Sequence, residues 1–343
     1  MLSGLLRTLA AACAAGFVAS AAAVLPSSSA VAEVPIEARE VRAWLMRIHD
    51  AASHRNFQGT FVVSAGGAVS SSRIAHFCVG ANQFERIESL DGQMRHVFRH
   101  NDIVHTKWPQ SHVAMIEQRN LLATFPALLQ SSDDRIVDFY EMRRQGTERM
   151  AGRDTDVLLV RPRDKLRFGY RLWADKETGL LLRVEVLGDN GEVLESSAFS
   201  DVTIGIKAQP DSVLGPMRKL DGYRVLRPAL TPARLDAEGW SLRQRVPGFE
   251  PVSCVKRSLA GMVDDGRDTV PSVLQSIHSD GLTYVSVFIE PYDPARHRQG
   301  MQTAIGATQT LMRRQGDSWV TVVGDVPAAT LRQFANALEQ SKK

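Results

Sequence analysis

The sequence predicts an α+β protein in which a long antiparallel meander of strands, opened by one helix, is followed by a smaller sheet with its own helix. Residues 41–52 place apolar side chains three and four positions apart, on one face of an α-helix: Val41, Leu45, Ile48 and Ala52. Residues 57–63 then alternate as a β-strand does. A helix that leads directly into the first of many strands predicts a curved sheet packed around that helix.

Short strand-like segments separated by turn residues fill residues 59–204. They are 73–79, 84–89, 95–99, 103–107, 113–117, 136–144, 157–161, 167–173, 180–187 and 193–199. Asp91-Gly92 between two of them is a tight-hairpin signal, because both turn positions favour positive φ. Roughly ten strands joined mostly by hairpins predict a barrel or a strongly curved antiparallel sheet.

Residues 119–130 interrupt this meander with an apolar helical face that Pro126 kinks or splits. A helix inserted there is expected to lie across the concave side of the sheet. It either completes the core or forms a lid over a cavity that accepts acyl chains. The lining expected for such a cavity is Phe61, Trp108, Leu121, Leu122, Phe125 and Leu128.

Changes in composition divide the chain into four parts. Arg7, an apolar run and Ala30-Val31-Ala32 predict a signal peptide over residues 1–32. Residues 33–206 hold the meander, and four prolines without apolar periodicity predict a linker over 207–238. Residues 239–343 predict a small α+β domain, with two hairpins and a final helix that Pro327 opens.

Catalytic and cofactor chemistry finds no support in the sequence. The chain has no metalloprotease, phosphate-loop, nucleophile-elbow or dinucleotide-binding motif, so we expect neither an enzyme nor a cofactor. His96, His100, His105 and His112 have no accompanying carboxylate or cysteine pattern, so no metal site is expected. Once Cys13 leaves with the signal peptide, Cys78 and Cys254 remain. They could pair in an oxidising compartment, but two separate, partly buried thiols are the favoured expectation.

Arginine is the more informative residue type. A net charge of +3 is too small to indicate nucleic acid as the main partner. Arginines nevertheless gather over residues 143–171 and again in the C-terminal part, at Arg296, Arg298, Arg313 and Arg314. Most of these arginines are consistent with the solvent-exposed face of a sheet. Guanidinium groups, however, also bind carboxylates and phosphates bidentately. The second group is therefore the predicted partner-binding surface.

Three stretches occur in the order found in a known family. They are Leu45-Met46-Arg47-Ile48 with residues 56–63, Ser89-Leu90-Asp91-Gly92, and Gly306-Ala307-Thr308 with residues 320–327. They resemble the RseB/MucB family, periplasmic negative regulators of the envelope-stress sigma factor (sigma-E/AlgU type). The resemblance implies a LolA/LolB-like half-open β-barrel with covering helices in the N-terminal domain.

The resemblance also implies a function in the periplasm. The protein would bind the periplasmic segment of an RseA/MucA-like anti-sigma factor and shield it from the stress protease. Mislocalised lipopolysaccharide or lipoprotein would release it. The alternative is a periplasmic lipid or lipoprotein carrier of LolA type, but a carrier needs no C-terminal α+β unit. The sequence leaves a homo-oligomer open.

Signal-peptide cleavage gives the first testable prediction. We expect the mature chain to begin at Glu33, because Ala30-Val31-Ala32 supplies the small residues that signal peptidase reads. N-terminal sequencing of the protein from the periplasmic fraction measures this directly. Recovery from the cytoplasm with Met1 intact would contradict it.

Overall fold

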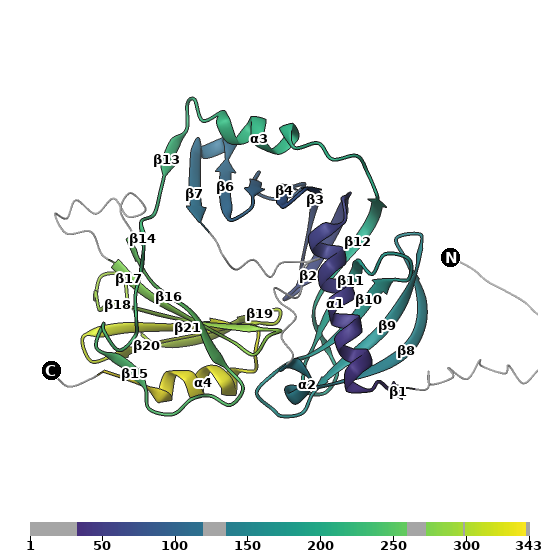
Figure 1. Cartoon of the computed structure of the whole chain (residues 1–343). Helices are drawn as coiled ribbons and strands as arrows, with labels where there is room; N and C mark the ends of the chain where they lie inside the picture. The colour runs from purple at the N-terminus through teal and green to yellow at the C-terminus, as the bar shows by residue number, and fades with distance from the viewer. Residues whose placement is uncertain (1–32, 119–134, 259–271, 298, 341–343) are drawn as a thin grey trace, which may run out of the picture. The chain divides into compact units, whose positions relative to one another are not determined.

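The computed structural model describes residues 33–118, 135–258, 272–297 and 299–340, and it contains two large sheets with helices packed on them (Figure 1). The predicted helix at 119–130 lies outside the described residues, and so do Leu121, Leu122, Phe125, Leu128 and Arg298. In the described part of the chain, no helix has the length and apolarity that crossing a bilayer requires.

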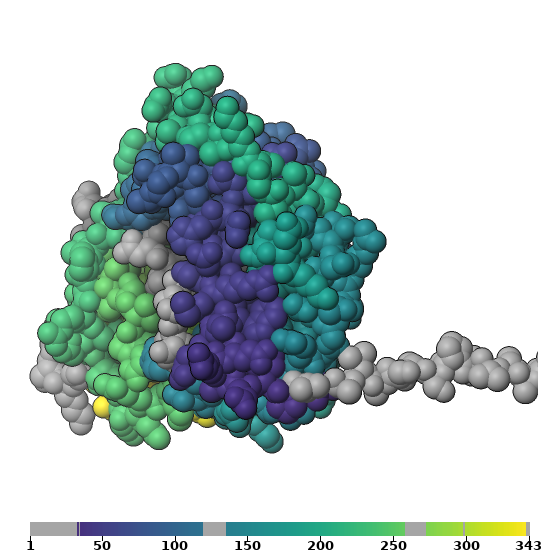
Figure 2. All heavy atoms as spheres, turned by 45° about the vertical axis from the view of Figure 1, so that its right-hand side comes forward, coloured from purple at the N-terminus to yellow at the C-terminus, as the bar shows by residue number. Residues whose placement is uncertain are grey.

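The opening helix and strand are confirmed. α1 spans Ala38–His54, and after two residues in extended or irregular conformation the chain enters β2, Phe57–Ala65. The four apolar residues predicted to face the core are all buried, and Trp44 and Ala51 join them. This face packs on the inner side of the strands that follow residue 139, in one cluster with Leu158, Leu172 and Val184. Figure 1 shows α1 lying across these strands, and Figure 2 shows its outer side at the surface beside them.

The first sheet is two antiparallel meanders joined by one long pairing. Its described strands are β1 (Val34–Pro35), β2, β3 (Ala68–Val79), β4 (Asn82–Ser89), β5 (His96–His100), β6 (Ile103–Trp108), β7 (Val113–Gln118), β8 (Tyr140–Met150), β9 (Arg153–Pro162), β10 (Gly169–Asp175), β11 (Leu181–Leu187), β12 (Val193–Ile204) and β13 (Arg224–Leu226). The order is β1-β8-β9-β10-β11-β12-β2-β3-β4-β5-β6-β7-β13, so β2 pairs with β12 across the junction. The two ends of this order do not meet, which confirms the half-open sheet.

One predicted strand is wrong at its start. The segment 136–144 begins as a helical turn, α2 (Ile136–Phe139), and becomes strand only at Tyr140. In this turn Ile136 is buried in the core, and Phe139 lies at its edge over a buried arginine. The β-branched composition indicated a strand, but burial of Ile136 and Phe139 three positions apart favours a turn of helix.

The second sheet has the order β14-β16-β17-β18-β21-β20-β19 among the described residues, and α4 (Ala328–Ala337) packs on it. Its strands are β14 (Leu230–Pro232), β16 (Glu250–Ser258), β17 (Ser272–Ser279), β18 (Tyr284–Pro291), β19 (Met301–Ile305), β20 (Thr308–Gln315) and β21 (Ser318–Gly324), and β15 (Trp240–Leu242) pairs separately with β22 (Leu338–Gln340). The two predicted hairpins and the final helix are confirmed. The sequence missed β19, because all five of its residues are exposed and show no apolar face.

The stretch expected to be a linker contains regular elements. α3 (Asp211–Arg218) buries Val213 and Met217 against Phe77, Phe84 and other residues of the first sheet. The apolar pair at positions i and i+4 was the available signal for this helix. The division of the chain at 207–238 stays a prediction.

A buried ion pair connects the two sheets. The guanidinium of Arg167, just before β10, donates through Nε to Asp280 Oδ2 at 2.7 Å, and neither side chain is exposed to solvent. Tyr140 donates its hydroxyl to the same carboxylate oxygen at 2.9 Å. The guanidinium also lies between the rings of Phe139 and Phe249, 4.4 and 4.9 Å from their centroids. Residues from both sheets thus complete one polar centre.

Further contacts join the sheets around this centre. Arg257 of β16 pairs with Glu117 of β7 at 2.7 Å, and Thr330 of α4 donates to the Leu166 carbonyl at 2.8 Å. Leu282 and Ala307, from turns of the second sheet, lie in the core cluster of the first. The apolar packing and the ion pairs therefore hold the sheets together at several points.

Removal of the Arg167 charge is expected to destabilise the protein strongly. In Arg167→Met the Asp280 carboxylate stays buried without its cation, so unfolding free energy should fall by about 3–5 kcal/mol. Tyr140→Phe removes one hydrogen bond only and should cost about 1 kcal/mol. Urea denaturation followed by circular dichroism gives both values. The exposed pair Arg243–Glu339 supplies the control, and Arg243→Met should cost less than about 1 kcal/mol. Equal losses in Arg167→Met and Arg243→Met would contradict the coupling.

Candidate functional site

Two residues of the predicted acyl-chain cavity, Phe61 and Trp108, lie in the described part of the chain. Phe61 packs edge-on against Phe199, with ring centroids 6.3 Å apart, in the cluster that holds Phe57. Trp108 is half-buried at the end of β6. Neither residue lines the cavity between the two sheets, the one along β9–β11 or the one around residues 233–254. The acyl-chain site stays a prediction, since the rest of its lining falls in 119–134.

The predicted arginine surface is engaged by other residues of the chain. Arg296 pairs with Asp293 at 3.2 Å and with Glu290 at 3.5 Å. Arg313 donates to Asn336 Oδ1 at 2.9 Å and to the Ala335 carbonyl, so it connects β20 to α4. Burial lowers the pKa of its guanidinium group. Arg314 lies 4.1 Å over the ring of Tyr292. A role for these arginines in binding a partner stays a prediction.

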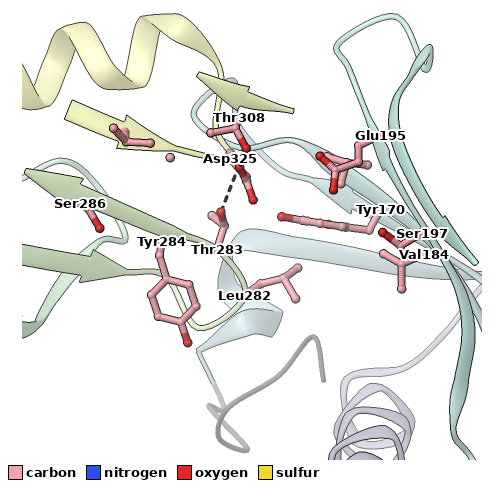
Figure 3. Close-up of a pocket in the computed structure, with 13 residues that line it drawn as sticks. Tyr170, Val184, Glu195, Ser197, Leu282, Thr283, Tyr284, Ser286, Thr308 and Asp325 are labelled. Carbon is pink, nitrogen blue, oxygen red and sulfur yellow. Dashed lines mark hydrogen bonds between the residues drawn. The ribbon is translucent and has the colours of Figure 1, made fainter. Parts of the chain in front are cut away.

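A different site lies where the two sheets meet. It is a cavity of about 260 Å³, lined from the first sheet by residues of β10, β11 and β12 and from the second by the turn before β18 and by β18, β20 and β21 (Figure 3). The lining residues are Tyr170, Val184, Val186, Glu195, Ser197, Leu282, Thr283, Tyr284, Ser286, Thr308, Val323, Gly324 and Asp325. The walls are thus mostly aliphatic and hydroxyl-bearing, with two carboxylates.

Local structure sets the positions of these side chains. Glu195 and Ser197 are two residues apart on β12, so both project from the same face of the strand. On the opposite side, Asp280 Oδ1 accepts hydrogen bonds of 2.9 Å from the amides of Leu282 and Thr283. Gly281 takes the positive φ of 99° that this tight turn requires. The buried ion pair and the cavity wall therefore share one turn.

The two carboxylates are held by hydrogen bonds from neighbouring turns. Thr308 donates its hydroxyl to Asp325 Oδ1 at 2.6 Å, and Thr283 donates to the Asp325 carbonyl at 3.1 Å. The amide of Ala307 donates to the Glu195 carboxylate. Figure 3 shows Glu195 and Asp325 projecting into the same space from opposite sides, with the hydroxyl of Tyr170 pointing toward Asp325 and Thr283.

The cavity has an acidic electrostatic character. Burial raises the pKa of Glu195, and the charge of Asp325 raises it further, although the Ala307 amide acts in the opposite direction. Burial and the charges of Asp325 and Asp280 also raise the pKa of the Tyr170 hydroxyl. No basic residue is among the described residues that line this cavity. Among the described lining residues, its two carboxylates therefore have no basic counterpart.

The sequence did not single out this site. Asp325 appeared only within the family-like ending, and Glu195 only within a predicted strand. The one available signal was the placement of a carboxylate, Glu195, and a hydroxyl, Ser197, two positions apart on a predicted strand, a pattern that is common in strands. Their approach to Asp325 depends on how the two sheets meet, which local periodicity does not specify.

The described residues form neither a metal-binding cluster nor a disulfide bond. No group of three or more His, Cys, Asp or Glu side chains in that part of the chain could hold a metal ion. Cys78 and Cys254 are half-buried and unpaired, as predicted. The sulfur of Cys78 lies 3.4 Å from His76 Nε2 and donates to the Ser53 carbonyl at 2.9 Å, beside the end of α1.

Comparison with known proteins gives consistent matches over most of the chain. The profile of the MucB/RseB N-terminal domain matches residues 40–217, and that of the MucB/RseB C-terminal domain matches residues 234–339. The Sigma factor AlgU regulatory protein MucB of Pseudomonas aeruginosa is 29% identical over 312 residues, 87% of this chain and 90% of that protein. The Sigma-E factor regulatory protein RseB of Escherichia coli is 25% identical over 299 residues, with the same two coverages. The solved complex of P. aeruginosa MucA/MucB matches with a TM-score of 0.67 and 26% identity, over 89% of this chain and 100% of the matched chain.

The raised pKa of Glu195 predicts a specific pH dependence. Folding raises this pKa above its usual value of 4.5, so the folded state binds the proton more tightly than the unfolded state. The contribution of Glu195 to stability is therefore full below pH 4.5 and is lost as pH rises through the raised pKa. Glu195→Gln should gain stability relative to the wild type as pH rises from about 4 to about 8.

Urea denaturation at a series of pH values measures this difference. Glu192→Gln, an exposed position in the turn that leads into β12, is the matched control and should show no such trend. A difference between wild type and Glu195→Gln that stays constant with pH would show that Glu195 is not held in an acidic, buried setting.

Proposed function

This chain belongs to the MucB/RseB family, and we propose that it is a periplasmic regulator that binds the periplasmic segment of a membrane anti-sigma factor. Bound in this way, the segment is shielded from the stress protease that starts its degradation. The observation that carries the proposal is the match to the solved MucA/MucB complex, which covers 89% of this chain at 26% identity. Both domain profiles support it, because the C-terminal α+β unit is present and follows the N-terminal sheet.

The described geometry supports the binding of an extended peptide. β19 is the last strand of the second sheet, and its outer side pairs with no described strand. All five residues are exposed, including the apolar Met301 and Ile305 at 54% and 67%. An edge strand of this kind offers backbone N–H and C=O groups and alternate side chains to an added strand.

Release by mislocalised lipopolysaccharide or lipoprotein completes the proposal. A lipid can shift the equilibrium only if it binds the partner-free protein more tightly, and the partner must then weaken lipid binding by the same factor. The LolA-type carrier is the alternative function. A carrier requires an acyl-chain cavity, whose expected lining falls largely in residues 119–134, and it does not require the C-terminal α+β unit that this chain has.

A reconstituted complex tests this function. The mature chain is mixed with the periplasmic segment of the MucA-like protein from the same organism, and segment cleavage by the stress protease is followed with time. We expect the chain to slow cleavage in proportion to complex formation, and lipopolysaccharide fragments to restore cleavage.

Two results would contradict the proposal in different ways. Absence of a complex at micromolar concentrations of both proteins would refute partner binding. Continued protection at lipid concentrations that saturate the free chain would refute release by lipid and leave partner binding in place.

A further inference from the structure

The cavity between the sheets has the chemistry of a binding site for one organic cation. Glu195 and Asp325 enter it from opposite sides, and no described lining residue carries a positive charge (Figure 3). Elsewhere at the same junction the carboxylate of Asp280 is neutralised by Arg167 within the chain. In this cavity a half-buried carboxylate, Glu195, and an exposed one, Asp325, face the same space, and no described lining residue supplies a cation.

An unused hydroxyl points to a ligand independently of the carboxylates. Ser197 on β12 is only 8% exposed and lines the cavity. No hydrogen bond joins its hydroxyl to another described residue, and the oxygen is accessible from the cavity because it is not among the enclosed unpaired atoms. A hydroxyl open to a cavity can accept a hydrogen bond from a donor that enters it. A ligand donor in the cavity would provide that partner.

The size and walls of the cavity restrict what the ligand is. Its volume, about 260 Å³, is below the range of roughly 300–1,000 Å³ that holds whole small molecules, so it suits a single side chain better than a lipid. Val184, Val186 and Leu282 provide an aliphatic wall for the methylene stem of such a side chain. A guanidinium or ammonium head has only donors, and the site offers mainly acceptors.

We infer that this cavity receives one arginine or lysine side chain of the bound partner segment, with Glu195, Asp325 and Ser197 as its acceptors. The inference rests on the proposed function, because it places one residue of the segment that the function requires. It also ties partner binding to the junction of the two sheets, since each sheet supplies one of the two carboxylates. A change in the relative position of the two sheets would separate the two carboxylates and so lower the affinity for the partner segment.

Small cations test the cavity without the partner. The mature chain is titrated with Nα-acetyl-arginine amide, Nα-acetyl-lysine amide and Nα-acetyl-citrulline amide, a neutral counterpart of arginine, and amide chemical shifts are followed by NMR. We expect saturable shifts near Ser197 and Thr283 with at least one of the two cations and none with citrulline, and comparison of the two shows which head group the site prefers. The double variant Glu195→Gln/Asp325→Asn should lose this binding.

The partner segment then tests the role of the cavity in the complex. The same double variant should bind the segment about ten- to a hundredfold more weakly than wild type, and the loss should shrink at high salt. Glu192→Gln/Asp317→Asn removes two exposed carboxylates outside the cavity and should bind as wild type does. Neutral substitution of each basic residue of the segment should identify one whose effect disappears in the double variant.

The outcomes separate the two proposals. If wild type binds no segment, the proposed function fails. If wild type binds the segment and the cavity variant binds it equally tightly, the inference fails and the function stands. Binding of calcium ions in place of the organic cations would also overturn the inference. Circular dichroism and urea denaturation of the variants exclude misfolding as the cause of weak binding.

Discussion

The buried ion pair between Arg167 and Asp280 is the interaction on which the arrangement of the two sheets depends. Transfer of each charge out of water costs several kcal/mol, so the pair is tolerated only with complete hydrogen bonding. Arg167 also donates to the Pro247 carbonyl and to Asp164, and Asp280 accepts from Tyr140 and from two amides. Any other placement of the sheets would leave a buried charge without its partners. The pair therefore favours the arrangement of the sheets in which Arg167 and Asp280 meet.

The cavity is a consequence of that arrangement. The turn that Asp280 organises carries Leu282 and Thr283 to the first sheet, and Thr283 in turn supports the backbone at Asp325. The apolar packing around Leu282 and Ala307 closes the junction on one side. On the other side, Glu195 and Asp325 face one cavity that no described basic residue lines. Within the described residues, one end of the junction thus has paired charges, and the other end has two carboxylates without a basic neighbour in the lining.

A regulator that must release its partner benefits from such coupling between sheets. A lipid that binds the first sheet can influence a partner on the second only if both ligands favour different arrangements of one linked structure. The contacts across the junction include the ion pairs Arg167–Asp280 and Glu117–Arg257 and the edges of both cores. These contacts link the half-open sheet to the strand edge and the acidic cavity.

The sequence by itself determined the elements whose pattern is local. The helix at Ala38–His54, its passage into β2, the hairpins of both sheets and α4 follow from periodicity and turn residues within about twenty positions. It missed α2 and α3, where burial of one or two side chains against distant residues decides the conformation. It also missed β19, whose side chains are all exposed and show no apolar pattern. Only the tertiary structure decided the β2–β12 pairing, the Arg167–Asp280 pair, 113 residues apart in the chain, and the approach of Glu195 to Asp325. The physical reason is that charges and strand edges far apart in the sequence have no shared periodicity, so their partners are fixed only when the two cores pack.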